Sequence, residues 1–103
     1  MWEALGDRTR RAIVERLAER PLAVGELAAE LPVGRPAVSQ HLKVLKEAGL
    51  VDDQPVGTRW IYRLNPAAVA ALRDQLDVYW NRALASYRVI VEQADQEPTR
   101  EEP

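Results

Sequence analysis

Residues 24–50 read VGELAAELPVGRPAVSQHLKVLKEAGL, and the fold that the sequence predicts depends on this stretch. A break at Pro32-Val33-Gly34 separates a short helix from a second, longer helix. At about 100° per residue, three side chains of the second helix share one apolar face: Val38, Leu42 and Leu45. Two helices in this arrangement are typical of a helix-turn-helix, which presents the polar face of its second helix to a groove of DNA.

The second helix, which we place at residues 35–48 and name the recognition helix, carries groups that bind bases and phosphates. Gln40 can form two hydrogen bonds with adenine, and Arg35 can do the same with guanine or hold a phosphate. Lys43 is a flexible point charge, which suits a phosphate better than a base. His41 lies at the edge of the apolar face, so a phosphate contact and a half-buried packing role are both open. The predicted DNA contacts of this helix are Arg35, Pro36, Ser39, Gln40, His41 and Lys43.

A β-hairpin is predicted after the recognition helix. Two extended segments flank a turn at Gly57, and Trp60, Tyr62 and Leu64 alternate onto one face of the second segment. Three helices followed by a hairpin form a winged helix-turn-helix, so the predicted class is mainly α with a small β-hairpin. The hairpin tip, residues 55–59, is named the wing and is expected to reach a minor groove or a phosphate. Its predicted DNA contacts are Thr58 and Arg59.

One further helix is predicted before the helix-turn-helix and another after the hairpin. Asp7 is a good N-cap for a first helix, and Asn65-Pro66 can begin a long final helix. Apolar side chains recur in the final helix at spacings of three and four, in a wide stripe that includes aromatic residues. Because aromatic side chains are enriched at interfaces, we expect this helix to pair with its copy in a homodimer. The predicted interface residues are Val69, Leu72, Leu76, Tyr79, Trp80, Ala83, Leu84 and Tyr87.

Length and composition fit one folded domain, which we place at residues 1–92, followed by an acidic tail at 93–103 that we expect to be disordered. The 103 residues are 47% hydrophobic and 29% charged. The absence of cysteine excludes disulfides and suits a reducing cytoplasm. The N-terminus lacks the pattern of a signal peptide, and no apolar run is long enough to span a bilayer, so no membrane partner is expected.

The net charge of −2 does not by itself indicate nucleic-acid binding. Its distribution is more informative. Residues 92–103 hold five acidic residues and one basic residue, which leaves 13 basic and 11 acidic residues, a charge of +2, in residues 1–91. Residues 32–63 also carry a charge of +2, from five basic and three acidic residues, so the basic groups concentrate where the helix-turn-helix is predicted.

Catalysis and metal binding find little support. The chain has one histidine, no cysteine and no Gly-rich phosphate loop. Asp52 and Asp53 are adjacent in a predicted strand, so their side chains point to opposite faces and cannot act as a carboxylate pair. We therefore expect no enzyme activity, no metal site and no cofactor.

Several segments together resemble the ArsR-type family of bacterial winged-helix repressors. They are Asp7-Arg8-Thr9-Arg10-Arg11, Gly25-Glu26-Leu27-Ala28, Val38-Ser39-Gln40-His41-Leu42-Lys43-Val44-Leu45, Ala48-Gly49-Leu50-Val51 and Gly57-Thr58-Arg59. The resemblance covers about residues 4–90 and implies a homodimeric repressor that binds an inverted-repeat operator in double-stranded DNA. It also implies that the first and last helices form the dimer, which adds Leu5 to the predicted interface.

The chain departs from the metal-sensing members of that family. Those members carry cysteines in the helix before the recognition helix, where this chain has Ala28 and Ala29, or His and carboxylate ligands in the last helix, where it has Asp77 and no histidine. The resemblance therefore indicates a metal-independent branch and leaves the effector unassigned. Two alternatives stay open: a protein-interaction module without DNA binding, and a ligand sensor with an apolar pocket near Trp80 and Tyr87.

Overall fold

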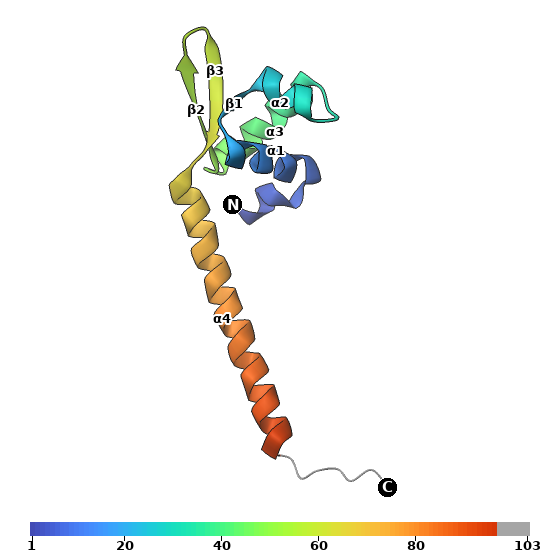
Figure 1. Cartoon of the computed structure of the whole chain (residues 1–103), viewed down its shortest axis with the longest axis vertical. Helices are drawn as coiled ribbons and strands as arrows, with labels where there is room; N and C mark the ends of the chain where they lie inside the picture. Colours follow the sequence, from blue (N-terminus) through green and yellow to red (C-terminus); the bar gives the residue numbers. More distant parts are fainter. Residues whose placement is uncertain (97–103) are drawn as a thin grey trace. The chain divides into compact units, whose positions relative to one another are not determined.

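The computed structural model describes residues 1–96 (Figure 1). The elements follow in this order: the 3-10 helix η1 (Trp2–Gly6), α1 (Arg8–Glu19), β1 (Leu22–Ala23), α2 (Val24–Glu30), α3 (Arg35–Glu47), β2 (Val51–Val56), β3 (Arg59–Leu64) and α4 (Pro66–Gln96). This architecture confirms the predicted winged helix-turn-helix with a long C-terminal helix, and α3 is the recognition helix. The chain divides into two compact units, Met1–Leu72 and a second unit that begins at Arg73.

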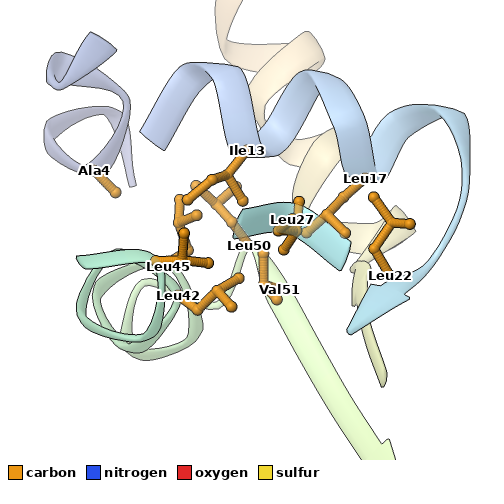
Figure 2. Packing of buried hydrophobic residues seen from close by; sticks show 10 residues of the cluster. Ala4, Ile13, Leu17, Leu22, Leu27, Leu42, Leu45, Leu50 and Val51 are labelled. Atoms are coloured by element: carbon orange, nitrogen blue, oxygen red, sulfur yellow. The ribbon is translucent and has the colours of Figure 1, made fainter. Parts of the chain in front are cut away.

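The core of the first unit is entirely apolar. Among the described residues, its buried side chains are Ala4, Ile13, Leu17, Leu22, Leu27, Val38, Leu42, Leu45, Leu50 and Val51, and no polar or charged residue is buried with them. Figure 2 shows side chains of α1, α2, α3 and the first two strands pointing toward one another. The recognition helix contributes three residues with no exposed surface, which confirms its predicted apolar face.

The ends of the helices follow from local chemistry. The Oδ1 atom of Asp7 accepts a hydrogen bond from the backbone N–H of Arg10 at 3.0 Å, so Asp7 caps α1 as predicted. The recognition helix begins after Gly34, with Pro36 in its first turn, where a missing N–H costs little. It is followed by Gly49, whose φ of 80° is the left-handed conformation expected at that end.

The three-stranded antiparallel sheet has the order β1-β3-β2. The predicted hairpin pairs Val51 with Leu64 and closes through Gly57, whose φ is 63°. Tyr62 and Leu64 pack against the core, whereas Trp60 lies near the hairpin tip and is 56% exposed. The predicted alternation of β3 therefore buries only the part of the strand that lies over the core.

Two short elements were not predicted from the sequence. The strand β1 has two residues and pairs with a segment about forty positions away, with Leu22 opposite Tyr62. The helix η1 precedes the Asp7 cap and places Ala4 in the core. Neither element is long enough to show a hydrophobic period, which is the signal that sequence analysis uses.

The final helix begins at Pro66, where the Oδ1 atom of Asn65 accepts a hydrogen bond from the N–H of Ala68 at 3.1 Å. It continues to Gln96, four residues into the segment that we expected to be a tail, and residues 97–103 lie outside the described residues. Although this helix has 31 residues, none of the helices in residues 1–96 has the hydropathy needed to cross a membrane.

Gly49 offers a direct test of how the recognition helix ends. A Cβ atom built on Gly49 meets no atom within 4 Å, so an alanine there would suffer only from the positive φ. We expect Gly49→Ala to lower the free energy of unfolding by roughly 1–2 kcal/mol in urea titrations. Gly6→Ala is the matched control, because its Cβ also meets open space and its φ is not positive. Equal effects of the two substitutions would contradict this explanation.

Candidate nucleic-acid interface

The exposed face of the recognition helix carries most of the residues predicted to bind DNA. Arg35, Pro36, Ser39, Gln40 and Lys43 are all exposed. Within residues 1–96, no hydrogen bond or ion pair engages the side chains of Ser39, Gln40 and Lys43. These three side chains are therefore free to take partners in a groove of DNA.

The histidine of this helix lies in a different environment. The His41 side chain is 22% exposed, and its Nδ1 atom lies 3.4 Å from Nη1 of Arg10 and 4.0 Å from Oδ1 of Asp7. The Nε group of Arg10 also donates a hydrogen bond to the carbonyl oxygen of Ala4. His41 thus packs against the beginning of α1, which favours the packing role over the phosphate contact that was also predicted.

A groove of about 530 Å³ lies where α2, the recognition helix and the wing meet, and we name it the α2 groove. It is lined by Ala23, Val24, Gly25, Glu26, Ala29, Arg35, Arg59 and Trp60. The fold therefore brings together Arg35 and Arg59, two predicted DNA contacts that are 24 positions apart in the sequence.

Gly25 allows the Arg35 guanidinium to approach the first turn of α2. A Cβ atom built on Gly25 would lie 2.6 Å from Nη2 of Arg35 and 3.1 Å from its Cζ atom. Any larger residue would force the guanidinium to move, which it can do because it is the end of a flexible side chain. This close approach gives Gly25 a structural role that sequence analysis did not assign.

The wing arginine is not free in this structure. A nitrogen of the Arg59 guanidinium pairs with Oε1 of Glu26, and the same oxygen accepts a hydrogen bond from the N–H of Ala23 at 2.9 Å. The hydrogen bond from Ala23, followed by the charge of Arg59, lowers the pKa of Glu26 below its ordinary value. Thr58 is exposed at the tip of the hairpin.

Other ion pairs decide which cations remain available. The Nζ atom of Lys46 lies 3.0 Å from Oδ1 of Asp53, and this carboxylate raises the pKa of Lys46. Arg16 and Arg20 both pair with Glu30. Lys43 has no such partner among residues 1–96, so it is better placed than Lys46 to meet a phosphate.

The residues predicted to form the dimer interface differ in how much of each is exposed. Leu5 and Leu72 are partly buried and pack against the core of their own chain, which leaves less of each for a partner. Leu84 is partly exposed. The remaining predicted residues are exposed: Val69, Leu76, Tyr79, Trp80, Ala83 and Tyr87.

Two features of residues 1–96 bear on ligand binding. Residues 1–96 contain no cluster of three or more His, Cys, Asp and Glu side chains that could hold a metal ion. A shallow concavity on α4 is lined by Leu76, Asp77, Tyr79, Trp80 and Ala83. Its lining does not include Tyr87, which the ligand-sensor alternative placed beside Trp80.

Known proteins with similar sequences are bacterial transcriptional regulators. Residues 7–53 match the family model for bacterial regulatory proteins of the arsR family. The HTH-type transcriptional regulator Rv2034 of Mycobacterium tuberculosis is 65% identical over 91 residues, which cover 88% of this chain and 85% of that protein. The transcriptional repressor SdpR of Bacillus subtilis is 32% identical over 77 residues, which cover 75% of this chain and 82% of SdpR.

A solved structure shows the same fold in a dimer. The solution NMR structure of the homodimeric winged helix-turn-helix DNA-binding domain Mb0332 from Mycobacterium bovis is 32% identical to this chain, with a TM-score of 0.64. The match covers 80% of this chain and 76% of that domain.

The Asp7 cap beside His41 predicts a dependence of stability on pH. The hydrogen bond from the Arg10 N–H is the main cause that lowers the pKa of Asp7. Because the pKa of Asp7 is lower in the folded state than in the unfolded state, where it is about 3.9, the ionised carboxylate stabilises the folded protein at pH values above about 3.9. This contribution is lost as the pH falls through the pKa of the folded state. We expect Asp7→Asn to lose less stability than the wild type between about pH 6 and pH 3, measured by urea titration. Asp74→Asn, on the exposed part of α4, is the control and should follow the wild type.

Proposed function

Because this chain belongs to the arsR family of bacterial regulatory proteins, we propose that it acts as a homodimeric repressor that binds an inverted-repeat operator in double-stranded DNA. It is a DNA-binding transcriptional regulator and not an enzyme. The observation that carries the proposal is the recognition helix, whose apolar side is fully buried while Ser39, Gln40 and Lys43 are exposed and unpaired within residues 1–96.

In the proposed complex, the recognition helix lies in a major groove. Gln40 and Arg35 bond to base edges, because both side chains can form two hydrogen bonds to one base. Lys43 holds a phosphate, and Ser39 bonds to a base or a phosphate within its short reach. Pro36, in the first turn, contributes an apolar surface. His41 orients the helix through its contact with Arg10.

The wing completes the proposed interface at the neighbouring phosphates or minor groove. Thr58 is exposed at the hairpin tip, and Arg59 follows it at the start of β3. An arginine at this place can enter a narrow minor groove or bind the backbone. To do so, it must first leave Glu26.

The proposed homodimer rests on the apolar face of α4. Side chains of Leu76, Tyr79, Trp80 and Tyr87 are each more than half exposed, which is costly for isolated apolar surface. Pairing of this face with its copy would bury them. The homodimeric state of the Mb0332 domain, which shares the fold, supports this arrangement. Two recognition helices would then match successive major grooves about 34 Å apart.

We propose that the regulator works without a metal or another cofactor and acts in the cytoplasm, where the DNA is. The support comes from the available donors. The chain has no cysteine, and the positions before the recognition helix are Ala28 and Ala29. Soft thiolate ligands for metals such as zinc or copper are thus absent from this helix. The proposal assigns no small-molecule or protein effector.

Substitutions on the recognition helix separate base contacts from phosphate contacts. We expect Gln40→Ala to weaken operator binding by about 1–3 kcal/mol while leaving binding to unrelated DNA unchanged. Lys43→Ala should weaken binding to every sequence and reduce the slope of log affinity against log salt by about one. Lys46→Ala is the matched control, because Lys46 is paired with Asp53. If Gln40→Ala weakened binding to all sequences equally, Gln40 would not contribute to base recognition.

Substitutions on α4 test the dimer. Glutamate in place of Leu76 or Ala83 would bury a charge at the proposed interface, so we expect monomers in sedimentation experiments and weaker operator binding together. Val78→Glu is the control, because Val78 lies about 200° from Leu76 around the helix. A wild-type protein that sediments as a monomer at micromolar concentration would contradict the proposed dimer.

A further inference from the structure

Both arginines that we assign to DNA lie against the first turn of α2. The Arg35 guanidinium lies over Gly25, and the Arg59 guanidinium pairs with the carboxylate of Glu26. Both line the α2 groove. The positive charge of the wing is therefore held by a carboxylate of the protein itself.

The carboxylate that holds Arg59 is itself fixed in place. Oε1 of Glu26 accepts the N–H of Ala23, one residue before α2 begins, and this hydrogen bond restricts where the carboxylate can lie. The pKa of Glu26 lies below its ordinary value, so the group is ionised at neutral pH and its contact with Arg59 is a charged pair. Glu26 thus presents a fixed negative charge to the wing, as a DNA phosphate would.

The pair can open without unfolding the hairpin. The side chains of Arg59 and Glu26 are 54% and 44% exposed, so water and ions reach both. The backbone of Arg59 is held in the sheet opposite Val56, and only its side chain needs to rotate for the guanidinium to leave. Exposed pairs of this kind are weak, and a phosphate can replace the carboxylate as the partner.

We propose that Glu26 competes with DNA phosphates for Arg59 and thereby lowers the affinity of the wing for any DNA backbone. This inference rests on the proposed function, in which Arg59 contacts DNA. Because the competition weakens a contact that carries no base information, it lowers the affinity for operator and for unrelated DNA alike. Glu26 thus sets the strength of binding to the DNA backbone without itself touching DNA.

The test uses Glu26→Gln in the full-length protein. Glutamine keeps a side-chain oxygen for the N–H of Ala23 but loses the charge that holds Arg59. We expect affinity for operator and for random-sequence DNA to rise by about two- to fivefold. We also expect the slope of log affinity against log salt to steepen by up to about one. Thermal melting should show that the variant folds as the wild type does.

Glu30→Gln is the matched control. Glu30 lies one turn further along the same helix, and its partners are Arg16 and Arg20 rather than the wing. The substitution removes the same charge as Glu26→Gln does. We expect it to raise DNA affinity less than Glu26→Gln does. Equal effects of the two substitutions would mean that net charge alone is responsible, and would overturn the proposal.

A double-mutant cycle with Arg59→Ala gives the decisive comparison. If Glu26 acts by holding Arg59, Glu26→Gln has no effect on DNA affinity once Arg59 is alanine. The same gain in both backgrounds would show simple repulsion between Glu26 and DNA and would overturn the proposal. A loss of affinity in Glu26→Gln would also overturn it, because the pair would then support the DNA-bound wing.

These variants also separate this proposal from the proposed function. If the wild type and Arg59→Ala bind operator equally well, the wing assignment fails and the competition fails with it, while the recognition helix stays as the DNA reader. If the wild type binds no DNA sequence, the proposed function itself fails.

Discussion

The burial of one face of the recognition helix is the constraint on which the rest of the structure depends. Val38, Leu42 and Leu45 have no exposed surface and pack into a core supplied by the other elements of the first unit. Burying each such side chain is worth about 1.5–3 kcal/mol, so rotating the helix about its axis would be very costly. The core therefore determines that Gln40 and Lys43 face outward, before any DNA is present.

The same core positions the wing, but an electrostatic contact determines whether its one charged residue, Arg59, is available to DNA. Tyr62 and Leu64 attach β3 to the core, whereas at the exposed end of the hairpin the side chain of Arg59 pairs with Glu26. The first turn of α2 thus acts as a partner for the wing as well as a support for the recognition helix. Affinity for DNA is, in our account, a balance between contacts within the protein and contacts with phosphates.

The helix-turn-helix could be predicted from the sequence because its information is local: a hydrophobic period, a proline and glycine break, and helix caps at Asp7 and Asn65. The contact between Arg59 and Glu26 could not be predicted, since the residues are 33 positions apart and either could face water. The role of His41 was open for a related reason. A residue at the edge of an apolar face is buried or exposed according to its neighbour, here Arg10 of α1.

The central claim is that a dimer of this chain recognises a specific operator, and selection of binding sites from a random pool of double-stranded DNA tests it most directly. Our account predicts enrichment of an inverted repeat whose half-sites lie about one helical turn apart, with affinity that falls steeply as salt rises. Enrichment of no sequence, with weak residual binding that disappears at modest salt, would contradict the account. That result would favour a winged-helix protein-interaction module instead.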